Sequence, residues 1–199
     1  MPRVRADDYD DKRSAIVDVA AGLFARFGYP ATKMEDVAKK CGASKSMTYY
    51  YFPKKEDLLL AILVDYCESV IAKFHKINAE ALPPEARLEQ FIRFYVQRTP
   101  RMRHRHVVLM QDIKFLGKAE RSRINKYSRQ LAEAMTVLLS EVNPHVRGKG
   151  DLLRAYSFLL FGTLNGIEEW FDTAGSVTAT ELAERTARLF LKGFLAETA

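Results

Sequence analysis

The chain has 199 residues, of which 48% are hydrophobic, and this is enough to bury a substantial core. Its net charge of +6 favours a polyanionic partner such as nucleic acid. No stretch approaches the roughly 18 uninterrupted apolar residues of a membrane span, and the first residues lack the pattern of an export signal, so we expect a cytoplasmic protein without membrane contact.

The first predicted helix runs from Asp11 to Phe27, after a short charged arm at residues 1–10. Its apolar residues recur at intervals of three and four and form one continuous stripe, as in an amphipathic helix. The stripe consists of Ile16, Val19, Ala20, Leu23, Phe24 and Phe27. Gly28 ends the helix, and the stripe is expected to pack against the segments that follow.

The next segment has the pattern of a helix-turn-helix. Thr32 and Glu35 have capping-box spacing, so Thr32 is predicted to cap a helix that Gly42 ends. Ser44 is the predicted N-cap of a second short helix, which ends at Phe52-Pro53 because a residue before proline disfavours the α conformation. Two short helices joined by a glycine-containing turn are typical of a motif that enters a DNA groove.

The rest of the chain is also predicted to be helical, with breaks at proline and glycine. The expected helices cover residues 56–78, 85–98, 101–116, 119–142, 151–171 and 178–195. No strand pattern is convincing, so the predicted class is all-α, with a three-helix helix-turn-helix domain (1–56) and a larger C-terminal helical domain (57–199). The last two helices are apolar over a wide arc, which predicts a homodimer interface, with a monomeric core as the alternative. A two-fold dimer also suits half-sites about 34–36 Å apart.

Basic residues gather in two regions. Residues 26–55 contain seven basic and two acidic residues, and residues 87–129 contain twelve and three. DNA phosphates account for the first region, and the second predicts a separate anionic ligand. Two cysteines, Cys41 and Cys67, lack metal-site spacing and are expected to be reduced thiols. Two histidines, His104 and His106, are too few for a metal site, so no metal or other cofactor is expected.

Catalysis is not expected. The chain contains no G-x-S-x-G, P-loop, HExxH or GxGxxG motif, and its carboxylates are scattered along predicted solvated faces. A helical adaptor without DNA binding is a rival from another class, which the basic start of the second short helix argues against.

The stretch AAGLFARFGYPATKMEDVAKKCGASKSMTYYYFPKKEDLL, residues 20–59, resembles the TetR family of bacterial one-component repressors. The resemblance rests on the glycine after the first helix, Thr32, the Val37-Ala38 pair, Gly42 and the Tyr49-x-Tyr51-Phe52-Pro53 ending. It implies a dimer of all-α subunits that releases double-stranded operator DNA when a small-molecule effector fills the larger domain. Three residues depart from the family pattern: Ser46, Thr48 and Tyr50.

The resemblance also implies DNA-binding roles. Thr32 and Lys33 are expected to meet phosphate, and Lys45 and Met47 to read guanine O6/N7 and a thymine methyl. Tyr49 and Tyr50 are expected to bind phosphates through their hydroxyl groups. The full DNA-binding set is Thr32, Lys33, Ser44, Lys45, Ser46, Met47, Tyr49, Tyr50 and Lys55.

Residues 161–194 are similar to the branch of the family that senses acyl-CoA thioesters, through Asn165, Trp170-Phe171 and Gly175. An acyl-CoA needs an apolar tunnel and several cations, which residues 87–129 supply. The expected effector-binding residues are Tyr95, Arg98, Arg101, Arg105, Met110, Lys114, Phe115, Phe158, Asn165 and Trp170, with Arg103, Arg121 and Arg123 as further cations. A drug-like or aromatic effector is the alternative.

Overall fold

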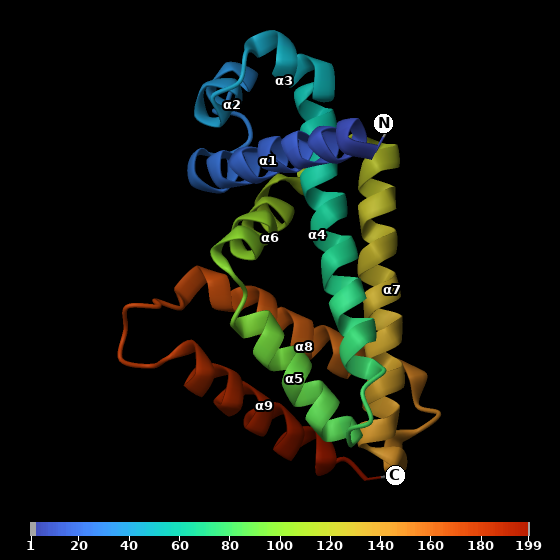
Figure 1. Cartoon of the computed structure of the whole chain (residues 1–199). Coiled ribbons are helices and arrows are strands. Elements are labelled where there is room, and N and C mark those ends of the chain that lie inside the picture. The colour runs from blue at the N-terminus through green and yellow to red at the C-terminus, as the bar shows by residue number, and fades with distance from the viewer. Residues whose placement is uncertain (1–2, 199) are drawn as a thin grey trace. The chain divides into compact units, whose positions relative to one another are not determined.

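The computed structural model describes residues 3–198, and every regular element in that range is a helix (Figure 1). The α-helices are α1 (Arg3–Phe27), α2 (Met34–Cys41), α3 (Lys45–Tyr51), α4 (Lys55–Asn78), α5 (Pro84–Val96), α6 (Pro100–Asp112), α7 (Lys118–Val142), α8 (Gly150–Trp170) and α9 (Ala179–Leu195). Two short 3-10 helices are η1 (Ile113–Phe115) and η2 (Pro144–Val146). The predicted all-α class is confirmed.

The chain forms two compact units. Unit 1 comprises Met1–Glu68 and Thr99–Asn125, and unit 2 comprises Ser69–Arg98 and Lys126–Ala199. The helices α4 and α7 contribute to both units. Unit 1 therefore contains α6 as well as the helix-turn-helix, whereas the functional boundary after residue 56 stays a prediction.

Unit 1 is built on α1, which packs along α6 and against α2 (Figure 1). Most of the predicted stripe faces inward, because Ala20 and Phe24 are fully buried with Val37 and Leu58, whereas Phe27 at the end of the stripe is 55% exposed. The helix begins at Arg3, so residues 3–10 add about two turns to it instead of forming the predicted arm.

Three of the four predicted helix ends in the helix-turn-helix are confirmed, including Phe52, which directly follows the last residue of α3. Gly42 has a φ of 65°, the left-handed conformation that lets a glycine end α2. The Ser44 hydroxyl caps α3 by accepting a hydrogen bond from the Met47 amide at 3.1 Å. The cap of α2 lies one residue later than predicted: Lys33 precedes the helix, and its amide donates to the Asp36 carboxylate at 2.8 Å.

Unit 2 has its core where α5 lies along α9 and packs on α8 (Figure 1). Phe91 and Phe194 are fully buried there, together with Met135 of α7. The buried Asn143 side chain donates to the Phe194 carbonyl oxygen at 2.8 Å and so fixes the end of α9. Among the helices described, none is both long enough and apolar enough to cross a bilayer.

Candidate functional site

The helix α3 carries an exposed row of polar and aromatic side chains. Ser46, Met47, Tyr49 and Tyr50 are all exposed, and Tyr50 most of all, with 72% of its surface accessible. The Ser46 hydroxyl lies 3.0 Å from that of Ser44, at the capped start of the helix. This surface offers hydroxyl groups, a thioether and rings to a partner, which is the chemistry needed to contact base edges and phosphates.

Lys45 at the start of α3 is paired with Glu35 of α2. Its ammonium nitrogen lies 2.6 Å from the Glu35 carboxylate, and both side chains are exposed. This hydrogen bond lowers the pKa of Glu35 and raises the pKa of Lys45. The Lys45 side chain is therefore accessible to DNA, but its ammonium group must break or share the ion pair with Glu35 in order to bind DNA.

Thr48, which departs from the family pattern, is fully buried. Its hydroxyl donates to the Ser44 carbonyl oxygen at 3.3 Å, within α3 itself. A buried hydroxyl without a partner would destabilise the helix, so this intrahelical bond is what allows threonine at an apolar position.

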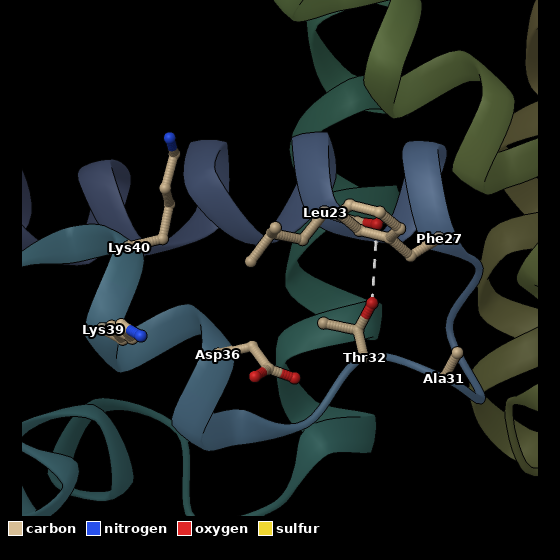
Figure 2. A pocket seen from close by; sticks show the side chains of 7 residues that line it. All are labelled: Leu23, Phe27, Ala31, Thr32, Asp36, Lys39 and Lys40. Atoms are coloured by element: carbon tan, nitrogen blue, oxygen red, sulfur yellow. Dashed lines mark hydrogen bonds between the residues drawn. The ribbon is translucent and has the colours of Figure 1, made fainter.

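Thr32 and Lys55 face inward, which corrects their predicted role as phosphate contacts. The Thr32 hydroxyl is turned towards α1 beside a groove of about 540 Å³ between α1 and α2 (Figure 2). It donates to the Leu23 and Gly28 carbonyl oxygens, at 3.4 and 3.0 Å. The Lys55 ammonium donates to the carbonyl oxygens of Tyr29 and Thr32, at 2.9 and 3.1 Å. Both residues are used to hold the loop between α1 and α2.

The remaining predicted DNA-binding residue, Lys33, is exposed at the start of α2. Its amide is taken by Asp36, so only its side chain is available to a phosphate. The structure thus brings the predicted residues of α3 and Lys33 onto the exposed surface of the helix-turn-helix.

Unit 2 brings three predicted effector-binding residues into one buried cluster. The Tyr95 hydroxyl donates to the Asn165 side-chain oxygen at 2.6 Å. The Arg98 guanidinium lies 4.1 Å from the Tyr95 ring centroid and 2.8 Å from the Glu168 carboxylate. The side chains of Arg98 and Glu168 are 1% and 9% exposed. Sequence reasoning missed Glu168, although it lies one helical turn after Asn165 on the same face of α8.

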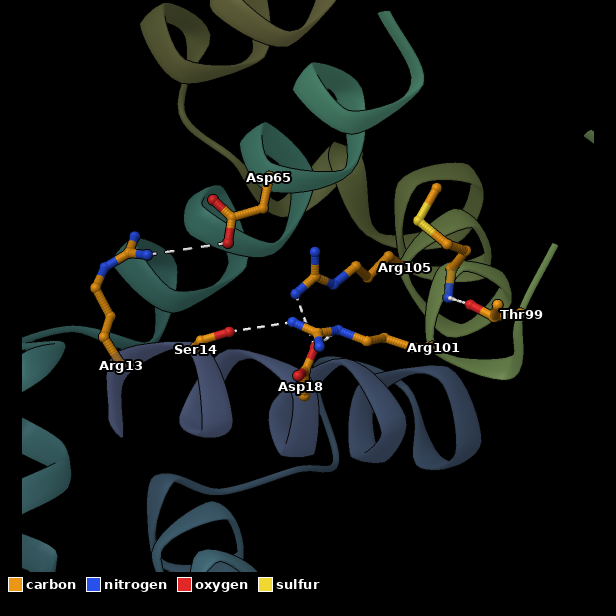
Figure 3. Close-up of polar contacts among 8 residues, drawn as sticks. Arg13, Ser14, Asp18, Asp65, Thr99, Arg101 and Arg105 are labelled. Carbon is orange, nitrogen blue, oxygen red and sulfur yellow. Dashed lines mark hydrogen bonds and ion pairs between the residues drawn. The ribbon is translucent and has the colours of Figure 1, made fainter. Parts of the chain in front are cut away.

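Arg101 and Arg105 belong to unit 1, where they bind a residue of α1 (Figure 3). Asp18 accepts from Arg101 at 2.6 Å and from Arg105 at 2.7 Å, and Arg101 also donates to the Ser14 hydroxyl at 3.1 Å. Their predicted role as anion ligands conflicts with this arrangement, because Asp18 already neutralises part of their charge.

The other predicted effector-binding residues are exposed. Met110, Lys114 and Phe115 lie at the surface near the end of α6, with the Phe115 ring stacked on Tyr29. Phe158 and Trp170 lie on α8 and are 59% and 64% exposed, so neither lines the Tyr95 cluster. Of the predicted cations near the end of α6 and the start of α7, Lys114, Arg121 and Arg123 are exposed.

Comparison with known families gives two matches that together span most of the chain. Residues 16–62 match the family described as bacterial regulatory proteins, tetR family. Residues 81–194 match the family described as tetracyclin repressor-like, C-terminal domain.

Individual relatives extend this likeness over nearly the whole chain. The HTH-type transcriptional repressor KstR2 of Rhodococcus jostii is 28% identical over 196 residues, which cover 94% of this chain and 95% of KstR2. A crystal structure of a TetR-family transcriptional regulator from Bordetella parapertussis is 30% identical, with a TM-score of 0.83, and covers 94% of this chain and 97% of its own. AibR in complex with isovaleryl coenzyme A and operator DNA is 21% identical, with a TM-score of 0.78, covers 89% of this chain and 97% of its own, and shares the fold.

Proposed function

Because the chain belongs to the TetR family of bacterial regulatory proteins, we propose that it is a transcriptional repressor that binds operator DNA as a dimer and releases it when an effector binds. The exposed row on the capped helix α3 carries this proposal, because it is the surface that a helix-turn-helix inserts into a major groove. Operator DNA lies in the bacterial cytoplasm, so this role also places the protein there.

On the DNA surface, we assign base reading to the start of α3 and phosphate binding to its end. Lys45 and Met47 follow the Ser44 cap, and the first residues of a recognition helix are those that reach base edges. Tyr49 and Tyr50 offer hydroxyl groups to the backbone, and Lys33 adds a charge from α2. Glu35 sets the availability of Lys45 through their ion pair.

The dimer is proposed to form through α8 and α9. Both helices carry exposed apolar side chains in addition to their buried ones, including Phe158 and Leu159 on α8 and Leu189 on α9, the last 78% exposed. Exposed apolar patches of this kind mark protein interfaces.

The effector is proposed to be an acyl-CoA thioester. Two features support this class: the sequence pattern of residues 161–194, and the exposed cations Lys114, Arg121 and Arg123, which suit the phosphates of the nucleotide. AibR, which shares the fold, binds isovaleryl coenzyme A.

An electrophoretic mobility shift with promoter DNA from the protein's own locus tests whether the protein binds specific DNA. The complex formed in that assay then tests which effector releases the DNA. A panel of acyl-CoA thioesters, the matching free acids and one aromatic drug-like compound is added to the complex and, in parallel, to the protein in a thermal-shift assay. We expect thioesters alone to dissociate the DNA and raise the melting temperature. Equal effects from the free acids would exclude recognition of the CoA moiety, and absence of any specific shift at low salt would favour the helical adaptor.

A further inference from the structure

The first turns of α1 contact the end of the recognition helix, although they precede the segment 16–62 that matches the DNA-binding family. The Tyr9 ring lies 4.6 Å from the Tyr51 ring and 6.3 Å from the Tyr50 ring, between centroids. One turn later, the Arg13 guanidinium lies 5.4 Å from the centroid of the Phe52 ring. Residues four apart share a helix face, so one face of α1 holds two successive residues at the end of α3.

This contact matters because α3 has only seven residues. A helix of that length is not stable alone and takes its geometry from its neighbours. The Ser44 cap fixes the start of α3, and Tyr9 with Arg13 fixes its end. Arg13 is itself held by Asp65 of α4, at 3.9 Å.

Tyr50 stays exposed beside the contact between α1 and α3, where its hydroxyl group is accessible to DNA. Its ring meets Tyr51 and Tyr9 nearly at right angles, and 72% of its surface is exposed. The two neighbouring rings support the Tyr50 ring, because edge-to-face contacts between aromatic rings are favourable. The direction in which Tyr50 presents its hydroxyl therefore depends on Tyr9.

The same segment of α1 carries negative charge. Asp10 and Asp11 follow Tyr9 directly and are exposed. Residues one and two positions apart on a helix point in different directions, so these carboxylates do not share the face of Tyr9 that meets α3. They add negative charge to the segment that contacts α3, and exposed negative charge repels phosphates whatever the base sequence.

We propose that Tyr9 to Arg13, the α1 clamp, sets the affinity for DNA: Tyr9 and Arg13 position Tyr50 for its phosphate contact, and Asp10 and Asp11 repel a duplex whatever its base sequence. The clamp rests on the proposed DNA-binding function and adds a determinant outside the helix-turn-helix. Tyr9 and Arg13 are positioning residues, since they act through α3.

The test compares a specific and a scrambled duplex. The full-length wild-type protein selects an operator from a random pool, and fluorescence anisotropy then measures affinity for that operator and for a scrambled duplex of equal length. Tyr9→Ala should weaken the binding of both duplexes by a similar factor, about three- to tenfold, because a displaced Tyr50 loses a phosphate contact that does not depend on base sequence. Tyr9→Phe keeps the ring and should restore operator affinity. Melting temperatures of both variants check that the fold is retained.

A second experiment tests the carboxylates with the double variant Asp10→Asn/Asp11→Asn. The control is Glu80→Gln/Glu133→Gln, which removes the same amount of negative charge from exposed residues of unit 2. The first pair should strengthen the binding of both duplexes about threefold at 50 mM salt, fading at 300 mM, and the control pair should not. Unchanged affinity of Tyr9→Ala for both duplexes, or equal effects of the two charge pairs, would overturn the α1 clamp. A wild-type protein that selects no duplex would overturn the proposed function and the clamp with it.

Discussion

At the scale of single residues, Lys55 holds the loop between α1 and α2 in place. Its ammonium donates to two carbonyl oxygens of that loop and lies 4.1 Å from the Tyr29 ring centroid. Tyr29 is itself buried and stacked on Phe115, and burial raises the pKa of its hydroxyl group. A charged side chain from α4 thus supplies hydrogen bonds to the backbone of this loop.

Replacing Lys55 should therefore reduce stability and leave DNA binding nearly unchanged. Lys55→Met removes two hydrogen bonds from a charged donor and should lower the free energy of unfolding by about 1–3 kcal/mol, measured by urea denaturation. Lys54→Met, at the exposed neighbouring position, is the control and should change stability by less than about 0.5 kcal/mol. If Lys55→Met instead lowered the salt slope of DNA binding by about 0.9 with stability intact, Lys55 would be a phosphate contact.

The sequence predicted Lys55 and Thr32 to bind DNA because both lie in a basic segment with the family pattern. What it could not show is which acceptors lie nearby, since Lys55 reaches carbonyl oxygens 23 and 26 residues away. Local features were predicted well: the Ser44 cap and the Gly42 turn depend on neighbours within four residues. The cap of α2 moved by one residue because the Thr32 hydroxyl bonds the end of α1 instead.

At the scale of whole elements, polar side chains that recur every four residues on both α1 and α6 hold these two helices together. Ser14 and Asp18 are four residues apart on α1, and Arg101 and Arg105 are four residues apart on α6, so two helical faces meet residue to residue (Figure 3). The Arg105 side chain is 7% exposed and that of Arg101 is 57% exposed. Sequence reasoning saw these arginines as an uncompensated basic run, because their carboxylate partner lies more than eighty residues earlier.

The two arginines should respond differently when Asp18 is changed. Asp18→Asn leaves the buried Arg105 guanidinium without a counter-charge and should cost about 3 kcal/mol of unfolding free energy, whereas Arg101→Met at the exposed position should cost less than about 1 kcal/mol. Urea denaturation of each variant provides the values. In the double variant Asp18→Asn/Arg105→Met the unpaired charge is gone, so part of the stability should return. If Asp18→Asn and Arg101→Met lowered the free energy of unfolding by equally small amounts, the burial of Arg105 would not make its ion pair with Asp18 more important for stability.

At the scale of the whole molecule, α8 has two different faces. Leu160 and Leu164 point into unit 2 and are fully buried, whereas Leu159 is 62% exposed. Gly162 and Gly166 are four residues apart near Leu159, and a Cβ atom added at either would meet nothing within 4 Å. The sequence predicted a wide apolar arc on α8. The structure shows which apolar residues of that arc lie in the core of unit 2 and which are exposed. Two small residues at this spacing would let a second helix approach the α8 backbone closely.

This outer face predicts a substitution that blocks assembly without disturbing the subunit. A Cβ atom at Gly162 meets no atom of its own chain within 4 Å, so we expect Gly162→Leu to leave the helicity measured by circular dichroism unchanged, while the leucine side chain should keep a partner's α8 away. Light scattering after size exclusion should then report a monomer where the wild type is a dimer. Operator affinity should fall about a hundredfold or more, because the two half-sites would no longer be bound by one linked pair of recognition helices. Gly150→Leu, equally free of internal contacts but at the start of α8, should remain dimeric. A dimeric Gly162→Leu would place the interface on another surface.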